Sequence, residues 1–224
     1  MDTLSDLQSF INNDSGLRAL LGQVSDRLSK DPSHDLAHCL RVALWTTRLG
    51  TPTVDIRAAL AAALCHDLIS VRKNSPLRGD AARLAAAEAR SILPDHGFNN
   101  HEVDEICQAI RDHSYSGGEA PGTDLGRALQ DADRLDALGA IGIMRAVTVG
   151  VSIGAAYFDM LDPWATGRPL NENAFMIDHF FTKLLRIGAT MHTPAARVEA
   201  ERRTQVMERF VTALAAEIGL PRPV

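Results

Sequence analysis

Apolar residues recur every three or four positions along most of this chain, which is the spacing that lines one face of an α-helix. The first clear example is residues 17–28, where several leucines and Val24 share one face. No segment shows the strict apolar–polar alternation of a half-buried strand. The pattern predicts helices at about residues 17–28, 35–49, 54–67, 80–93, 99–113, 124–138 and 141–151, one opening at Asn171 with Phe175, Phe180, Leu184 and Leu185 toward the core, and a last one from Pro194 to about residue 218.

Polar and helix-breaking residues support several of these boundaries. Asp35 can cap the helix that follows it, and residues 50–52 contain the Gly and Pro that end that helix. Asn99 and Glu102 have the spacing of a capping box, in which each side chain bonds the other residue's backbone. Pro194 suits the first turn of the last helix, where its missing N–H costs nothing.

The composition favours the same fold class. Alanine, the best helix former and a poor strand former, is frequent, and only 5% of the residues are aromatic. The chain has 224 residues and shows no internal repeat, low-complexity tract or domain linker. We therefore predict a single compact all-α domain over residues 1–224, with roughly nine or ten helices.

Charge, hydropathy and cysteine usage exclude several classes of protein. A net charge of −5 argues against a dedicated nucleic-acid binder, which usually carries a basic surface. The longest apolar run, Ala58–Cys65, is too short to cross a bilayer, and the first residues lack the basic region of a signal peptide. Cys39, Cys65 and Cys107 show no paired spacing, so reduced core thiols are expected. These features predict a cytoplasmic protein that binds neither nucleic acid nor membrane.

Histidine and aspartate residues stand near the ends of the predicted helices. His38 lies in the helix predicted from residue 35, His66 and Asp67 directly follow the apolar run, and Asp131 and Asp133 lie in a later helix. Taken singly, such a histidine is usually a packed side chain and such an aspartate a helix cap. Imidazole and carboxylate groups together suit a divalent cation with open positions for water. The ordered set therefore favours a metal site built from several helices.

Three ordered motifs resemble the H…HD…D signature of the HD-domain metal-dependent phosphohydrolases. They are His38-x-x-Arg41-Val42, Leu64-Cys65-His66-Asp67 and Ala132-Asp133-Arg134-Leu135. Residues 31–35, 73–76, 131–140 and 177–180 also resemble a group of small stand-alone bacterial HD hydrolases. The resemblance spans about residues 20–215 and implies an HD-type helical domain.

The resemblance implies that His38, His66, Asp67 and Asp133 are metal ligands. Asp133 is preferred to Asp131 because the family's last aspartate stands in an Ala-Asp-x-Leu context. On a regular helix the two aspartates point about 200° apart, so both are not expected to bind one ion. Asp131 is expected instead to orient one of the metal ligands without contacting the ion. One divalent ion is expected. Mn, Ni, Co or Fe is preferred, with Mg as an alternative, because two of the expected ligands are histidine nitrogens and magnesium sites typically use oxygen ligands.

Other residues are candidates for catalysis and substrate binding. Asp67 is expected to act in catalysis as well as in metal binding. Some members of the family that this chain resembles bind a second metal through two further histidines, but the spacing of His96, His101 and His113 does not fit that pattern. His113, at the end of a predicted helix, is therefore expected to contact phosphate or donate a proton. A phosphoryl group gains negative charge during transfer, so positively charged side chains are expected to contact it. The preferred substrate-binding residues are Arg41, Lys73 and Asn74, with Arg72, Arg134 and Arg145 as further cationic candidates.

These expectations define a function and its alternatives. The resemblance implies a phosphohydrolase acting on a nucleotide, with cleavage of a nucleoside triphosphate to monophosphate and pyrophosphate through a metal-bound hydroxide preferred. The alternatives are a nucleoside monophosphate phosphatase and a non-catalytic nucleotide sensor with the same fold. The partner expected is a small-molecule nucleotide, and a homodimer is one alternative for the oligomeric state. Loops at 70–79 and 114–122 are expected to border the pocket, and the turn at 162–169 to cover it.

Overall fold

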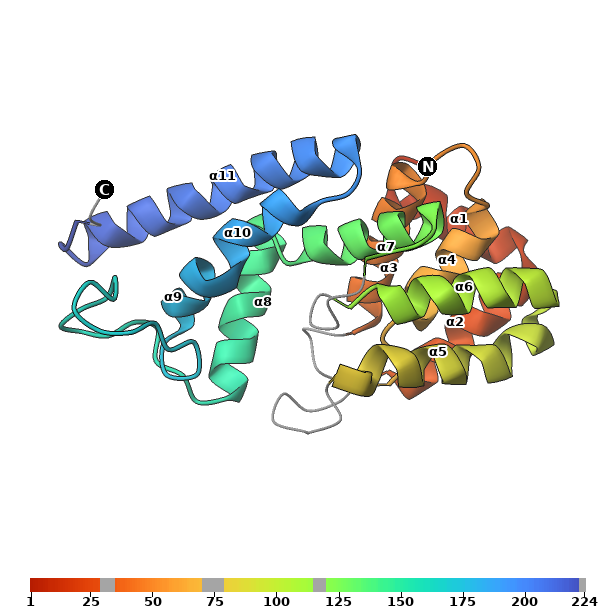
Figure 1. Ribbon diagram of the computed structural model, residues 1–224, viewed down its shortest axis with the longest axis horizontal. Coiled ribbons are helices and arrows are strands. Elements are labelled where there is room, and N and C mark those ends of the chain that lie inside the picture. Colours follow the sequence, from red (N-terminus) through yellow and green to blue (C-terminus); the bar gives the residue numbers. More distant parts are fainter. Residues whose placement is uncertain (29–34, 70–78, 115–119, 222–224) are drawn as a thin grey trace. The chain divides into compact units, whose positions relative to one another are not determined.

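The computed structural model describes residues 1–28, 35–69, 79–114 and 120–221, and most of these residues are helical (Figure 1). Within these ranges no β-strand forms, and a single isolated bridge joins Ala156 to Phe175. The all-α prediction is therefore confirmed. The α-helices are α1 (Leu4–Asn13), α2 (Ser15–Arg27), α3 (Leu36–Leu49), α4 (Ile56–Cys65), α5 (Ala81–Ile92), α6 (Asn100–Asp112), α7 (Asp124–Asp136), α8 (Gly139–Ser152), α9 (Met176–His179), α10 (Leu185–Ile187) and α11 (Pro194–Glu217), with short turns η2 (Leu93–His96), η4 (Phe180–Leu184, π-helical) and η5 (Gly188–Thr190).

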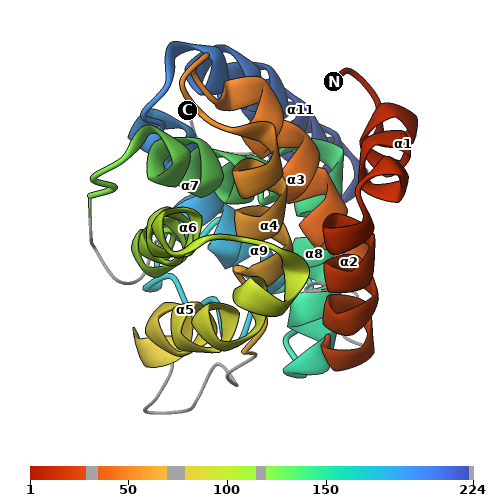
Figure 2. The same cartoon turned by 90° about the vertical axis from the view of Figure 1, so that its right-hand side faces the viewer.

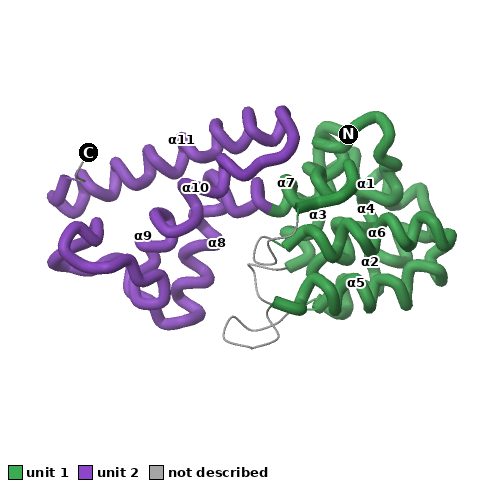
Figure 3. Tube along the Cα trace, in the orientation of Figure 1, with its two compact units in different colours: residues 1–133 green, residues 134–224 purple. Residues whose placement is uncertain are grey.

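The helices group into two compact units, residues 1–133 and 134–224 (Figure 3). The boundary between them falls inside α7, so one continuous helix belongs to both units. The expected single domain over residues 1–224 remains a prediction. No single helix in the described part of the chain is long and apolar enough to cross a membrane, and only α7 and α8 reach that length and apolarity as a bent pair.

Helix α4 forms the centre of unit 1. Every residue from Ala58 to Cys65 is buried, and α4 packs against α2, α3 and α6 (Figure 2). A helix that is apolar on all sides belongs in the interior, and its alanines let the neighbouring helices approach closely. The ends of α4 therefore lie at the two ends of this bundle. The residues that follow Cys65 emerge where the neighbouring helices also begin or end.

The predicted capping residues set the starts of three helices. The Asp35 carboxylate accepts a hydrogen bond from the His38 backbone N–H at 2.9 Å, which begins α3 where the sequence predicts. Both hydrogen bonds of the Asn99–Glu102 capping box are present at the start of α6. Thr193 accepts from the Ala196 backbone N–H and Pro194 follows it in the first turn of α11. These local signals act independently of the tertiary fold.

The three cysteines are all buried and none is in a disulfide, which agrees with the prediction of core thiols. Burial raises the pKa of the Cys65 thiol far above its ordinary value, and the neighbouring charge of Cys107 raises it further. A thiol held protonated in this way is a poor nucleophile and a poor metal ligand. The cysteines therefore contribute packing.

Two segments depart from the sequence prediction. Helix α1 was not predicted, although Thr3 and Asp6 form a capping box and Leu7 and Ile11 bury one face. The predicted helix start at Asn171 is also wrong, because helix begins only at Met176.

Long-range pairing explains the later helix start. The Met176 backbone N–H donates to the Ala156 carbonyl at 2.8 Å, and the Ala156 N–H donates to Ala174 at 2.9 Å. These bonds hold residues 171–175 as a turn instead of a helix. Phe175, in this turn, is only half-buried, and so is Leu185, whereas Phe180 and Leu184 lie in the core as predicted.

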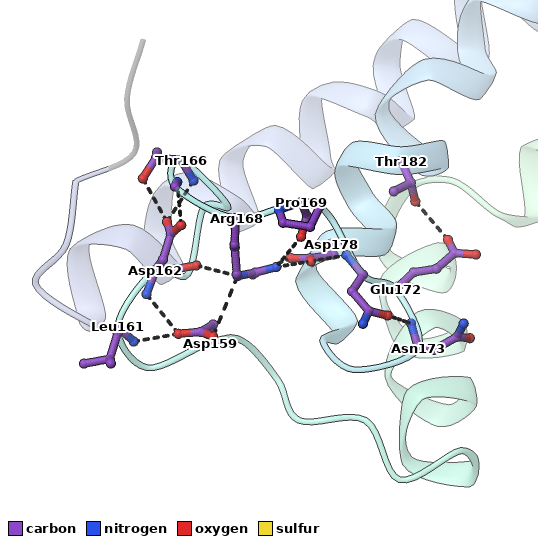
Figure 4. A network of polar contacts seen from close by, with 12 residues as sticks. Asp159, Leu161, Asp162, Thr166, Arg168, Pro169, Glu172, Asn173, Asp178 and Thr182 are labelled. Carbon is purple, nitrogen blue, oxygen red and sulfur yellow. Dashed lines mark hydrogen bonds and ion pairs between the residues drawn. The ribbon is translucent and has the colours of Figure 1, made fainter.

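The loop before α9 is ordered by a polar network inside unit 2 (Figure 4). The carboxylate of Asp178, which is fully buried, accepts hydrogen bonds from both terminal nitrogens of Arg168 and from the Asn171 backbone N–H. The Arg168 guanidinium also lies over the Phe175 ring, 4.3 Å from its centroid. Asp162 closes the neighbouring turn by accepting from the backbone N–H groups of Thr166 and Gly167. The turn predicted at 162–169 is thus a well-bonded structure.

Replacing Asp178 with alanine should lower the free energy of unfolding by about 3–5 kcal/mol, because the largely buried Arg168 guanidinium loses its buried carboxylate partner and is left with the longer pair with Asp159 at 3.7 Å. Urea unfolding followed by circular dichroism measures this loss. The matched control is Asp104→Ala, which breaks the exposed pair with Arg90 and should cost less than about 1 kcal/mol. Equal losses in the two variants would contradict the prediction.

Candidate metal centre

Four side chains from three helices of unit 1 converge at one place. His38 lies in the first turn of α3, where the Asp35 cap fixes its backbone. His66 caps the C-terminus of α4 and Asp67 follows it. Asp133 lies in the last turn of α7. The C-terminal ends of α4 and α7 carry partial negative charge, which favours a cation beside them.

The donor atoms of these residues lie within a few ångströms of one another. The Nε2 atoms of His38 and His66 are 3.2 Å apart. Asp67 Oδ2 lies 3.5 Å from each of these nitrogens. Asp133 Oδ1 lies 3.5 Å from His38 Nε2 and 3.9 Å from His66 Nε2. The structure therefore brings together all four residues that the sequence singled out as ligands.

This geometry fits a bound divalent ion. Ligand atoms about 2.1 Å from one ion lie about 3.0–3.4 Å from each other when adjacent, close to the separations found here. His66 Nδ1 lies 2.7 Å from the Ala63 carbonyl, which only accepts hydrogen bonds, so Nδ1 carries the proton and Nε2 keeps its lone pair. A backbone carbonyl that orients a histidine in this way is the usual outer support of a metal ligand. His38, His66 and Asp67 together form a cluster able to hold a metal ion.

The electrostatics of the cluster also favour a cation. Burial lowers the pKa of His66 and outweighs the opposite effect of the neighbouring Asp67, so the neutral imidazole is favoured. For Asp67 and Asp133 burial acts to raise the pKa, but the surrounding imidazoles outweigh it, and both carboxyls titrate below their usual range, Asp67 well below. Both side chains remain about a quarter exposed, so they reach solvent. The two carboxylates are therefore ionised near neutral pH, and a divalent ion would balance their negative charge.

His113 lies directly beside the cluster, as its position at the end of α6 allows. Its ring stands edge-on to that of His66, with the centroids 5.0 Å apart, and the residue is buried. Its Nδ1 lies 2.6 Å from the Ile110 carbonyl and therefore donates to it, which leaves Nε2 for contact with a ligand. By contrast, His96 bonds Gln23 and His101 is exposed, so within the described residues neither joins the cluster.

The remaining predicted residues fall into three groups. Asp131 is fully buried in α7, which excludes a solvated cap and is compatible with a supporting role behind the ligands. Arg41 lies one turn after His38 in α3 and is half-buried. Lys73 and Asn74, with most of the two loops expected to border the pocket, lie outside the described residues. Their roles stay predictions.

Two of the other cationic candidates make structural contacts in unit 2. Arg145 pairs with the buried Asp136 at 2.9 Å, and Arg134 donates to the Thr190 carbonyl at 2.6 Å. These contacts anchor the end of α7. They were not predicted, because their partners lie 9 and 56 residues away along the chain.

An α-helical bundle that carries His, His-Asp and Asp ligands in this order defines the class of HD-domain proteins. Residues 35–138 match the HD domain family, and this range contains all four residues of the cluster. The chain belongs to the HD superfamily, as the resemblance in its sequence predicts.

The chain is similar to two proteins from Bacillus species, to YpgQ in both sequence and structure and to an HD-superfamily hydrolase in structure. YpgQ of Bacillus subtilis is 34% identical over 191 residues, which cover 83% of this chain and 84% of YpgQ. A crystal structure of B. subtilis YpgQ in complex with ADP has a TM-score of 0.70 at 28% identity, covering 90% of this chain and 97% of that one. A crystal structure of an HD-superfamily hydrolase from Bacillus thuringiensis has a TM-score of 0.67 at 29% identity, covering 89% and 95% of the two chains.

Proposed function

We propose that this protein is a divalent-metal-dependent phosphohydrolase that cleaves a nucleoside triphosphate into a monophosphate and pyrophosphate. The observation that carries the proposal is the convergence of His38, His66, Asp67 and Asp133, with the proton of His66 held on the nitrogen that faces away from the cluster. Membership of the HD superfamily supports a hydrolase. The ADP complex of the similar YpgQ supports a nucleotide as the substrate.

In this proposal the four converging residues hold the ion, and each has a structural reason to do so. When bound, such an ion lowers the pKa of water and offsets negative charge on a phosphoryl oxygen. The Ala63 carbonyl keeps the His66 ring in the orientation that presents Nε2. Asp67 turns Oδ2 to the two imidazoles and is partly exposed, so its second oxygen can accept a hydrogen bond from the attacking water. Its low pKa suits it to orienting that water rather than to acting as a strong base.

His113 is assigned to the phosphate group. Its Nδ1–H is occupied by the Ile110 carbonyl, so Nε2 is the atom that can hold a proton against a phosphoryl or leaving-group oxygen. Arg41, Lys73 and Asn74 are assigned to binding of the triphosphate, and the positive charges of Arg41 and Lys73 would offset its remaining negative charge. Asp131 is assigned to the support of a ligand. The set of two imidazoles and two carboxylates favours Mn, Ni, Co or Fe, with Mg as the alternative.

A panel of nucleoside mono-, di- and triphosphates, assayed with Mn, Ni, Co, Fe and Mg in turn, tests this function. Separate detection of pyrophosphate and orthophosphate shows which bond breaks. The proposal expects pyrophosphate and a monophosphate from a triphosphate, in a reaction that needs the added ion. Orthophosphate released from monophosphates would favour a phosphatase instead. Tight nucleotide binding without turnover under every ion would overturn the enzymatic proposal in favour of a sensor.

A further inference from the structure

Three arginine side chains make contacts at the last three residues of α7, which directly follow Asp133. Arg134, Leu135 and Asp136 each take part in one of these contacts. The contacts are Arg134 to the Thr190 carbonyl at 2.6 Å, Arg203 to the Leu135 carbonyl at 2.6 Å, and Arg145 to the Asp136 carboxylate at 2.9 Å. All of these residues belong to unit 2.

The contact of Arg203 acts on the helix backbone itself. The last four carbonyls of an α-helix lack partners within the helix and carry its negative end. The Leu135 carbonyl is one of them, and it accepts from the Leu138 N–H at 3.0 Å and from Arg203 NH1 at 2.6 Å. A guanidinium at this point satisfies the carbonyl and offsets the charge of the helix end. It therefore opposes fraying of the turn that contains Asp133.

The structure holds Arg203 itself in one orientation. Its side chain is only 12% exposed, and its Nε donates to Glu199 Oε1 at 2.7 Å. Its aliphatic stem lies against Gly139, whose φ of +70° is the left-handed region that favours glycine. A Cβ at Gly139 would lie 3.2 Å from both Cβ and Cγ of Arg203. The turn between α7 and α8 thus leaves room for the arginine.

We propose that Arg203 is a positioning residue for the metal centre: it fixes the last turn of α7 through the Leu135 carbonyl and thereby sets the position of the Asp133 carboxylate. This inference rests on the proposed role of Asp133 as a ligand. Asp133 and Leu135 are two residues apart in one continuous helix, so loosening the carbonyl moves the carboxylate. Metal ligands tolerate little displacement, and changes in their supporting groups typically weaken metal affinity 10–100-fold.

The test is direct Mn²⁺ binding to the purified protein without nucleotide, measured by electron paramagnetic resonance of the free ion. Arg203→Met should weaken the Mn²⁺ dissociation constant about tenfold. Arg203→Lys should recover part of the affinity, because an ammonium can donate one hydrogen bond to the carbonyl. The matched control is Arg202→Met, since Arg202 also bonds Glu199 from α11 but is 65% exposed. It should bind Mn²⁺ as the unmodified chain does. If Arg203→Met fails to fold, Glu199→Gln loosens the same arginine and should weaken binding in the same direction.

The outcomes separate this inference from the proposed function. His66→Ala reports on the metal centre: if it binds Mn²⁺ as tightly as the unmodified chain, the centre is wrong and the positioning role falls with it. If His66→Ala loses the ion while Arg203→Met keeps full affinity, only the positioning role is overturned. A lower melting temperature of Arg203→Met with unchanged Mn²⁺ affinity would likewise reduce Arg203 to a purely structural arginine.

Discussion

Replacing His66 with alanine should abolish metal retention and, with it, hydrolysis. His66 Nε2 lies within 3.9 Å of donor atoms from His38, Asp67 and Asp133. Its loss therefore removes a nitrogen that neighbours all three of the other ligands. Since changes to supporting groups alone cost 10–100-fold in affinity, loss of the ligand itself should exceed about 100-fold. Elemental analysis of the purified variant measures retained metal, and the nucleotide assay measures turnover.

The control for this variant must separate loss of the ion from loss of the fold. Circular dichroism should show the helical content of His66→Ala preserved, because the buried alanines that position α4 are untouched. His101→Ala removes an exposed histidine in the first turn of α6 and should leave metal content and activity unchanged. Stoichiometric metal in His66→Ala would show that the ion lies elsewhere.

Replacing His113 with alanine should lower kcat about 10²-fold while the metal is retained. The reason is the division of roles proposed here: His113 lies beside His66 but donates its Nδ1–H to Ile110, and positioned general acids typically contribute 10²–10⁴-fold. Steady-state kinetics with the preferred triphosphate, together with metal analysis, measure both quantities.

The comparison variant for His113 is His96→Ala. His96 is also a partly buried histidine near a helix end, but it bonds Gln23 and stands outside the cluster, so kcat should be unchanged. Loss of the metal from His113→Ala would contradict the assignment and make His113 a ligand. Full activity with metal bound would reduce it to a packing residue.

Much of the fold was predictable because its signals are local. Asp35 and the Asn99–Glu102 pair cap their own helices within three residues, and the run of alanines in α4 specifies a buried helix by itself. The start of α9 was not predictable in this way. It depends on backbone pairing between Ala156 and Met176, which are 20 residues apart.

The site shows the same division between local and distant causes. That His66 and Asp67 follow a buried helix is a local fact, and so is the bond from His66 Nδ1 to a carbonyl three residues earlier. That His38 and Asp133 arrive at the same point is a property of the assembled bundle, and the family resemblance supplied it. The bond from Arg203 to Leu135 spans 68 residues and has no signature in the sequence.

The alanine helix α4 also fixes the rotational setting of the metal centre. Its residues from Ala58 to Cys65 are buried on every side, so packing against the neighbouring helices prevents α4 from rotating about its axis. One residue inserted or removed within it would swing His66 by about 100° and shift it about 1.5 Å along the axis. The number of residues between the Asp55 cap and His66 therefore sets both the position and the orientation of the His66 side chain. Exchanging one small side chain of α4 for another should preserve them, whereas inserting or deleting a residue should not.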